Sequence, residues 1–454
     1  MEHAKVKIAY IGGGSRGWTH ILMRDLALCP ELSGEVYLYD IDLPAARLNE
    51  EYGNWLQKQK GVLSDWQYRA VKTQKEALKD ADFVIISITP GGLKLMGQDL
   101  KIARKYGIIH TVGDTVGPAG LMRIMRTVPI YSGIAHEIAK ICPKAWVINY
   151  TNPMSACTRI IGIAEPSLKV FGCCHEVFSA QNFLATLAKK YLKCPLPPRQ
   201  EIKVNVLGIN HFTFIDKATW KGRDLLELVK KHINQKNIIR KYTKKEIKKE
   251  NNFFTCHYQI TFEMFKRYGI LAAAGDRHLA EFVPWFLTCE DSAYRWGVDI
   301  TPIEYRLKVY NASPLLFKKR ILGQEKFKLT HSDEEGTDLM KALVGIKPLM
   351  TNVNYRNEGQ IENLPKGAIV ETNAYFSKNS IRPIKAGRIH DGLYPLVMRH
   401  VCNLEMVVNS VLKGDKQLGF HAFLNDPLCK TSMEDTWNMY NEMLNANKKY
   451  LKLK

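Results

Sequence analysis

One stretch near the start of the chain restricts the fold more than any other. Residues 6–11 are apolar except for Lys7 and typical of a buried strand. A glycine-rich loop follows from Gly12, and a helix is expected from about Trp18. Gly12, Gly14 and Gly17 have the G-x-G-x-x-G spacing, in which the backbone can approach a pyrophosphate at the helix N-terminus. The pattern predicts an α/β fold with an N-terminal Rossmann-like, doubly wound parallel sheet.

Two further positions fit a dinucleotide site. Asp40 ends the second expected strand, residues 35–39, where a carboxylate usually binds the ribose hydroxyls. An acid there favours NAD over NADP, although Arg47 nearby leaves NADP open. Thr89 begins a Thr-Pro-Gly-Gly turn after the strand expected at residues 81–88, and such a turn can pass close to a nicotinamide ribose.

Polar residues follow three more expected strands, at residues 145–149, 169–172 and 202–209. They are Asn152, Cys174 and His211, in that order. Ligands of such sheets gather at the C-terminal ends of the strands, so we expect these side chains to lie together. Cys174 and His211 are candidate metal ligands, and two protein ligands would leave positions for substrate and water. Each could instead be an ordinary core residue.

Two acidic loops are the other candidates for chemistry. Asp114 stands among small residues at 113–118, where it could also cap a helix. Asp276 is followed by Arg277 and His278 within an otherwise apolar stretch, which indicates either an ion-pair cluster or a site. Arg277 and His278 could hold a substrate carboxylate.

Length and composition set the organisation. A chain of 454 residues suggests two domains, and because the βα alternation fades after residue 200, we place them at 1–200 and 201–454, the second an α+β domain for substrate, metal and oligomerisation. No apolar run approaches the ~20 residues of a membrane span, and the start leads directly into a strand, so a cytoplasmic enzyme without a membrane partner is expected.

The net charge of +20 does not by itself indicate a nucleic-acid partner. Much of it lies in residues 221–250, which contain 11 Lys and Arg against 4 Asp and Glu, and no nucleic-acid-binding module surrounds them. We expect a solvated helical face or mobile flap there, with an anion-steering surface as the alternative.

Several motifs together resemble family 4 of the glycoside hydrolases, over about residues 6–430. They are Ile11-Gly-Gly-Gly-Ser15, Asn149-Tyr-Thr-Asn-Pro153, Cys174-His-Glu-Val177, Gly208-Ile-Asn-His211 and Asn363-Leu-Pro365. The α-galacturonidase branch is the most similar, through Gly113-Asp-Thr-Val-Gly-Pro118, Gly172-Cys-Cys-His-Glu-Val-Phe178, Gly208-Ile-Asn-His-Phe-Thr213 and Gly275-Asp-Arg-His-Leu-Ala-Glu-Phe282. The phosphosugar branch usually has Cys-Asn-x-Pro at Cys174, so a phosphosugar is not expected.

The resemblance implies a lactate dehydrogenase-like two-domain architecture, NAD, and Mn²⁺ or another divalent transition metal. In this family NAD oxidises sugar C3, a base removes the C2 proton, the aglycone leaves, water adds, and NADH returns the hydride. Cys174 and His211 match the metal ligands, and Asp276 the base. The acid is His175 or Asp114. Asn152 matches a substrate contact, while Ser15 and Arg16 join Gly12, Gly14, Asp40 and Thr89 at the cofactor.

The expected substrate is thus a short α-galacturonide, hydrolysed by a homodimer or homotetramer. The same mechanism on neutral α-glucosides, α-galactosides or α-glucuronides is one alternative. Another comes from Asn149 and Asn152-Pro153, which resemble the Asn-Pro turn of lactate and malate dehydrogenases. An NAD-dependent 2-hydroxy acid dehydrogenase would, however, give Cys174 no role.

Overall fold

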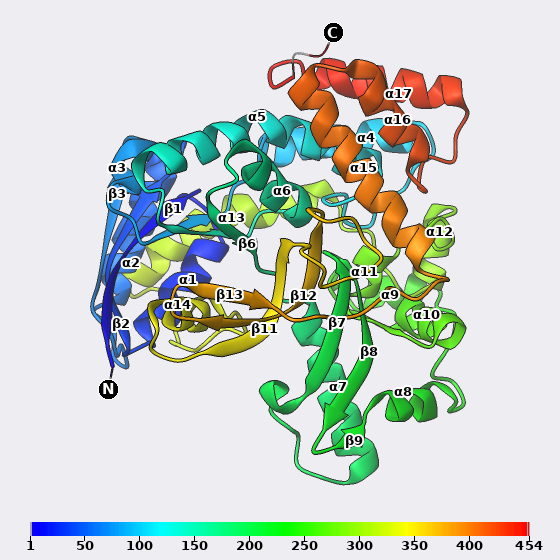
Figure 1. The fold of residues 1–454 in the computed structure, drawn as a ribbon, viewed down its shortest axis with the longest axis horizontal. Coiled ribbons are helices and arrows are strands. Elements are labelled where there is room, and N and C mark those ends of the chain that lie inside the picture. Colours follow the sequence, from blue (N-terminus) through cyan, green and yellow to red (C-terminus); the bar gives the residue numbers. More distant parts are fainter. Residues whose placement is uncertain (1, 452, 454) are drawn as a thin grey trace.

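Six parallel strands form one part of the main sheet (Figure 1). They are β1 (Ala4–Ile11), β2 (Leu32–Tyr39), β3 (Trp66–Val71), β4 (Phe83–Ile86), β5 (Trp146–Asn149) and β6 (Lys169–Gly172) in a computed structural model that describes residues 2–451 and 453. Their order is β3-β2-β1-β4-β5-β6, and each neighbouring pair is parallel. The strand order reverses at β1, as in doubly wound folds, so the predicted Rossmann-like sheet is confirmed.

Helices cover both faces of these strands, because alternate side chains enter two different cores. Ile8 and Ile85 belong to the core that includes α1 (Trp18–Ala27), α2 (Leu43–Leu56) and α14 (Gly336–Val344). Ala9 and Val84 belong to the core that includes α3 (Gln74–Leu78), α4 (Gly92–Lys105), α5 (Gly117–Ile141) and α6 (Met154–Ala164). Burial on both faces explains why strands such as β4 are apolar at every position.

Three strands from far along the chain extend this sheet beyond β6. β11 (Leu349–Arg356) pairs antiparallel with β6, with Asn354 opposite Gly172. β12 (Ile369–Ser377) and β13 (Ser380–Pro383) follow as antiparallel neighbours. The main sheet therefore contains strands from both sides of residue 200. The division into 1–200 and 201–454 stays a prediction, and it does not separate one sheet from another.

A second, smaller sheet has the order β10-β8-β7, with β9 paired to β8. Its strands are β7 (Lys203–Ile209), β8 (Phe212–Trp220), β9 (Arg223–Asp224) and β10 (Leu271–Ala272). It shares a core with α7 (Glu176–Leu192), α8 (Leu226–Ile233) and α10 (Gln259–Tyr268), to which Leu184, Val206 and Phe262 contribute. This antiparallel sheet with its helices is the α+β part that the sequence predicts.

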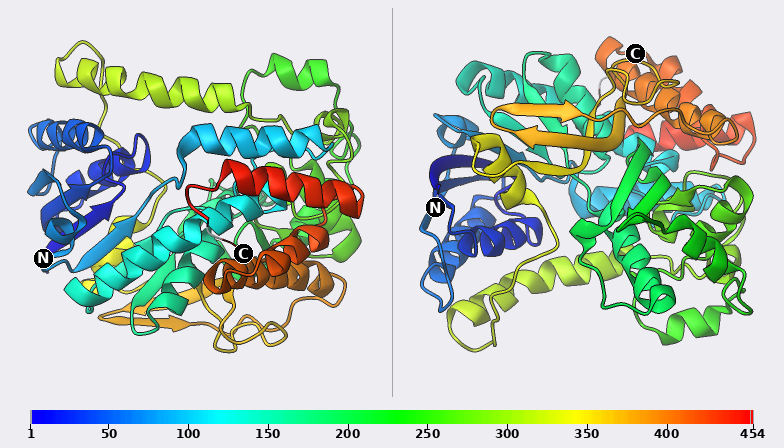
Figure 2. Two further views of the ribbon diagram at one scale, coloured as in Figure 1. Left: turned by 90° about the horizontal axis from the view of Figure 1, so that it is seen from above. Right: turned by 60° about the horizontal axis from the view of Figure 1, so that its bottom comes forward.

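The remaining helices connect and close these two parts. α15 (Tyr394–Lys413), α16 (Lys416–Asn425) and α17 (Met433–Ala446) lie over α4 and α5 (Figure 1). α13 (Ile303–Ile321) extends from the second part across to α2 (Figure 2). The ring centre of its Phe317 lies 3.6 Å from that of His20 on the neighbouring α1. The shorter elements are η1 (Arg199–Glu201), α9 (Lys244–Lys249), α11 (Asp276–Leu279) and α12 (Glu290–Arg295).

The Lys-rich segment contains α8 and α9, in agreement with a helical face. Several of its bases are paired: Lys248 lies 2.7 Å from Asp299, and Lys244 lies 3.3 Å from Glu290. Among the helices of residues 2–451, we find none with the length and apolar character needed to cross a membrane.

Candidate functional site

The glycine-rich loop turns sharply between β1 and α1. Gly12 has a φ of +96°, and a Cβ atom there would lie 2.1 Å from the carbonyl oxygen of Ser87. A Cβ on Gly13 would lie 2.7 Å from the Cα of Leu38. Only glycine permits such a close approach of backbone to backbone. Among the described residues no side chain caps the N-terminus of α1, so its first N–H groups can face an anion, as a pyrophosphate site requires.

The other predicted cofactor residues surround this loop. The Asp40 carboxylate accepts hydrogen bonds from the backbone N–H groups of Gly14 and Asp42, at 2.9 Å each, and burial raises the pKa of its carboxyl. Ser15 donates its backbone N–H to Gly12 within the loop. Arg16 stacks 3.7 Å above the ring of Tyr310 on α13.

Thr89 lies in the turn between β4 and α4, and its side chain is exposed. Its carbonyl oxygen accepts a hydrogen bond from the backbone N–H of Gly92, at 2.8 Å. This turn follows the C-terminal end of β4, the neighbour of β1 in the sheet. Thr89 therefore lies at the same edge of the sheet as the glycine-rich loop, where the parallel strands end.

A cavity of about 570 Å³ lies at the C-terminal ends of β5 and β6. Trp18, the first residue of α1, reaches it directly after the glycine-rich loop. Among the predicted site residues, the cavity is lined by Asp114, Asn152, Cys174, His175, His211, Arg277 and His278. Side chains that lie far apart in the sequence thus share one space beside the nucleotide-binding loop.

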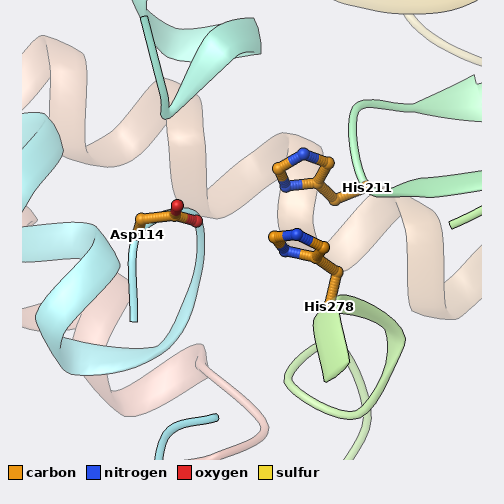
Figure 3. Close-up of side chains that lie close together, drawn as sticks. All are labelled: Asp114, His211 and His278. Atoms are coloured by element: carbon orange, nitrogen blue, oxygen red, sulfur yellow. The ribbon is translucent and has the colours of Figure 1, made fainter. Parts of the chain in front are cut away.

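Three of these side chains form a cluster of possible metal ligands (Figure 3). Asp114, His211 and His278 each offer one ligand atom, and these atoms lie within 4.8 Å of one another. The two imidazole rings stack with centres 3.9 Å apart. The Thr115 hydroxyl lies 2.8 Å from the Asp114 carboxylate and 2.9 Å from Nδ1 of His211. A carboxylate with two imidazoles suits Mn, Fe or Zn.

The protonation of the cluster also suits a cation. Burial lowers the pKa of His211 to about 3 and that of His278 to about 4, so both rings are neutral at pH 7. Burial acts to raise the pKa of Asp114, but His278, His211 and nearby arginines outweigh it and hold that pKa below its usual range. One anionic and two neutral donors at pH 7 are the forms that coordinate a metal.

Cys174 and His211, the predicted ligand pair, line the same cavity. A buried hydrogen-bond network centred on Glu371 joins the segments that carry them. The Asn352 amide donates to the Cys174 carbonyl at 3.1 Å and to the Glu371 carboxylate at 2.7 Å. The Asn210 amide, adjacent to His211, also donates to Glu371, at 3.3 Å. Burial raises the pKa of the Cys174 thiol well above its ordinary value. Within the described residues, Cys174 is not a member of the cluster of three.

His175 lies apart from that cluster, at the start of α7. Its Nδ1 lies 2.9 Å from the Glu334 carboxylate, and its ring lies 5.7 Å from the Trp18 ring. The bond to Glu334 raises the pKa of His175. One imidazole nitrogen is thereby held by a carboxylate, and among the described residues the other has no hydrogen-bond partner. Such an arrangement orients a proton-transfer group.

Asp276, the expected catalytic base, does not face the cavity. Its carboxylate accepts hydrogen bonds from the Ile260 N–H (3.2 Å), the Thr261 N–H (2.9 Å) and the Thr261 hydroxyl (2.8 Å), all in the first turn of α10. The residue is 1% exposed and does not line the cavity. The carboxylate is therefore turned toward the helix rather than toward a substrate, and the base role stays a prediction that this arrangement does not support.

Asn152 and Arg277 do face the cavity with unused polar atoms. Asn152 Oδ1 is buried, as is Nε of Arg277, and neither has a hydrogen-bond partner among the described residues. Arg123 Nε donates to the Asn152 carbonyl at 2.9 Å, which fixes the backbone. Buried polar atoms are normally satisfied, so these two indicate contacts that a ligand would complete.

Some residues of the site are absent from the sequence prediction. Arg306, Glu176 and Tyr258 line the cavity, while Glu334 and Glu371 orient its groups. Glu176 could have been identified, since it stands within the Cys-His-Glu-Val motif. The others carry no local signal, because they reach the site from segments that only the tertiary structure brings close.

Comparison with known proteins identifies a family whose models match most of the chain. The model of the family 4 glycosyl hydrolases matches residues 7–190, and that of their C-terminal domain matches residues 206–429. An α-galacturonidase of Thermoanaerobacter italicus is 47% identical, over 98% of this chain and 97% of its own length.

Solved structures share the fold. A Bacillus subtilis chain described as a glucosidase has 42% identity and a TM-score of 0.91, covering 98% of this chain and 100% of its own. The 6-phospho-β-glucosidase of Thermotoga maritima, solved with manganese, NAD⁺ and glucose-6-phosphate, has 22% identity and a TM-score of 0.77, covering 99% and 100%. At that identity the second comparison indicates a common fold alone.

Proposed function

Because this chain belongs to family 4 of the glycosyl hydrolases, we propose that it hydrolyses short α-galacturonides with the help of NAD and a divalent metal ion. Family membership confirms the resemblance seen in the sequence motifs, and it sets aside the 2-hydroxy acid dehydrogenase alternative. The choice of galacturonide over neutral sugars is supported by the α-galacturonidase at 47% identity and by the four branch motifs.

One observation carries the proposal. A single cavity contains the Asp114, His211 and His278 donors, the free Asn152 amide oxygen and the Cys174 and His175 side chains, and it begins beside the nucleotide-binding loop. A glycosidase that works with two carboxylates needs neither a dinucleotide nor a metal next to its substrate. The family's oxidation–elimination chemistry needs both.

The chain's own residues fit the two cofactors. The close backbone passage at Gly12 and Gly13 and the open N-terminus of α1 would hold the pyrophosphate of NAD, with Asp40 near its ribose. His211 would hold Mn²⁺ or a similar ion, together with Asp114 and His278 or with Cys174. When bound, NAD would supply hydride transfer at sugar C3, and the metal would supply Lewis-acid stabilisation of sugar oxygens.

Proton transfer to the leaving aglycone is assigned to His175 rather than to Asp114. The His175 ring has one nitrogen held by Glu334 and no partner for the other within the described part of the chain, whereas Asp114 faces the two histidines of the cluster. Asn152 and Arg277 would bind and orient the sugar, since both present unpaired polar atoms.

We also propose that the enzyme works in the cytoplasm, as a homodimer or homotetramer. All ten cysteines are free thiols, which suits a reducing compartment. Light scattering after size-exclusion chromatography would give the mass, and a monomer at micromolar concentration would contradict the oligomer.

The direct test is release of p-nitrophenol from p-nitrophenyl α-galacturonide in the presence of NAD, Mn²⁺ and a thiol reductant. We expect turnover that stops when either cofactor is removed, and deuterium at sugar C2 when the reaction runs in D₂O. Absence of release, with NADH accumulating from a 2-hydroxy acid instead, would overturn the proposal. Hydrolysis without deuterium at C2 would show direct displacement at C1 and reject the mechanism.

A further inference from the structure

Two arginine side chains of the cavity lack an anionic partner. Arg277 comes from α11 and Arg306 from α13, and both line the cavity. Among the described residues, neither guanidinium has a carboxylate oxygen within 4.0 Å, and the Nε atoms of both are buried without a hydrogen-bond partner. Arg306 makes one contact, from Nη2 to the Val112 carbonyl at 3.3 Å. Arg277 lies 4.7 Å above the Phe254 ring.

Two other buried or largely buried arginines do have a carboxylate partner. Arg126 is fully buried against Asp99, and Arg199 lies 2.6 Å from Glu335. Removing a guanidinium from water without a counter-charge is costly, and burial lowers the pKa of both Arg277 and Arg306. Two neighbouring cations without such partners indicate that an anionic ligand normally completes this corner of the cavity.

The acidic groups nearby are already engaged. Asp114 points toward His211 and His278 (Figure 3). Glu176 accepts the Gly275 N–H at 2.7 Å, and Glu281 accepts three consecutive backbone N–H groups, from Thr111 to Gly113. Asp114 acts on both arginines from beyond ion-pair distance, and none of these carboxylates pairs directly with either, so both guanidinium groups are left for a ligand carboxylate.

We infer that Arg306, together with Arg277, binds the C5 carboxylate of the uronide and makes the enzyme select uronides over neutral glycosides. This inference rests on the proposed function. A guanidinium can donate two parallel hydrogen bonds to a carboxylate, whereas the CH₂OH group of a galactoside offers no charge to either arginine. The selecting residue therefore lies on α13, outside every motif of the sequence.

The test replaces Arg306 with Met and with Lys and compares p-nitrophenyl α-galacturonide with p-nitrophenyl α-galactoside. For Arg306→Met we expect kcat/KM for the galacturonide to fall by about 10- to 100-fold, the size expected for one charge-assisted pair, mainly through KM. The residual rate on the galactoside should change less than threefold. Arg306→Lys keeps the positive charge but not the two parallel N–H donors of the guanidinium. Its kcat/KM for the galacturonide should therefore lie between those of the wild type and Arg306→Met.

Binding of the product gives a second readout that does not depend on turnover. D-galacturonic acid should bind the wild-type holoenzyme more tightly than D-galactose does, by calorimetry, and Arg306→Met should remove most of this difference. Arg159→Met is the matched control, since Arg159 pairs with Glu405 at 2.7 Å and does not line the cavity. It should leave both substrates unaffected.

The outcomes separate the two proposals. If the wild type hydrolyses the galacturonide and Arg306→Met, with wild-type melting temperature and NAD affinity, stays within threefold of it, the arginine assignment is overturned and the proposed function stands. If Arg306→Met fails to fold, Arg306→Lys and the binding data decide in the same way. A wild type inactive on galacturonide overturns the proposed function, and the arginine assignment with it.

Discussion

His211 shows how one residue's backbone conformation shapes the site. It lies in the two-residue turn between β7 and β8 with a φ of +64°, a region that costs a non-glycine residue about 1–3 kcal/mol. The turn directs its ring into the cavity, against His278. Glycine or asparagine would fit such a turn with less strain. We therefore infer that histidine occupies this position because the site needs its imidazole ring.

At this scale we predict which residues hold the metal. His278→Gln should weaken Mn²⁺ binding by more than about 10-fold, because even the loss of a residue that supports a metal ligand lowers metal affinity by about 10- to 100-fold. NAD affinity should be retained. The measurement is Mn²⁺ titration of the purified protein, followed by calorimetry. Cys174→Ser is the companion variant: if it alone removes Mn²⁺ binding and His278→Gln does not, the cluster of three is not the ligand set.

The element that Asp276 completes is α10. Tyr258, in the N-cap position, has a φ of +58° and its side chain caps nothing among the described residues, so the carboxylate from another segment accepts the N–H groups of the first turn instead. These hydrogen bonds also fix the position of α11, which begins with Asp276 and carries Arg277 and His278 at the cavity. A capping contact thus positions two residues of the site.

A substitution distinguishes capping from catalysis. Asp276→Ala should lower the free energy of unfolding by about 1–3 kcal/mol, since it leaves buried N–H groups without an acceptor, as measured by urea unfolding. Asp415→Ala, at the exposed N-cap of α16, is the control and should cost about 1 kcal/mol. Asp276→Asn should keep most of the stability. If Asp276→Asn folds normally yet loses all activity, Asp276 acts as the catalytic base after all.

Across the whole molecule, α13 joins the two parts that the reaction requires. Arg16 of the nucleotide-binding loop stacks on its Tyr310, Phe317 packs on His20, and Arg306 reaches the substrate cavity. Movement of this helix would therefore alter the cofactor side and the substrate side together. The sequence of α13 has no continuous apolar face, because the helix packs against different parts of the fold along its length.

Buried histidines away from the metal cluster should make global stability depend on pH. Burial lowers the pKa of His20, His110 and His400 to about 4. Unfolded histidine binds its proton near pH 6.5, so between pH 6.5 and 4 the unfolded chain holds more protons and stability falls as the pH falls. Each residue contributes up to about 3 kcal/mol across this window.

The measurement is the melting temperature between pH 7.5 and 4.5, with EDTA present to exclude metal effects. His400→Gln should reduce the difference between the two ends of the window, since Gln can still donate to the Phe282 carbonyl that His400 contacts but does not titrate. His136→Gln, at an exposed position, should leave the difference unchanged. Equal pH dependence in wild type and His400→Gln would contradict the assignment.

The sequence by itself determined the parallel sheet, the nucleotide-binding loop and seven of the residues that line the cavity. Glycine spacing, apolar runs and strand-end positions are local features, and parallel strands bring their C-terminal ends to one edge whatever follows. For the same reason Asp40, Asn152, Cys174 and His211 could be identified as site candidates before any contact was known.

Only the tertiary structure decided how those residues divide their roles. Asp114 joined His211 and His278, His175 was paired with Glu334, Asp276 turned toward α10, and Arg306 entered from α13. Each outcome depends on a partner about 15 to 195 positions away, and local sequence does not encode which distant segment will pack there. The direction of a side chain is set by the contacts that bury it, and those contacts exist only in the folded chain.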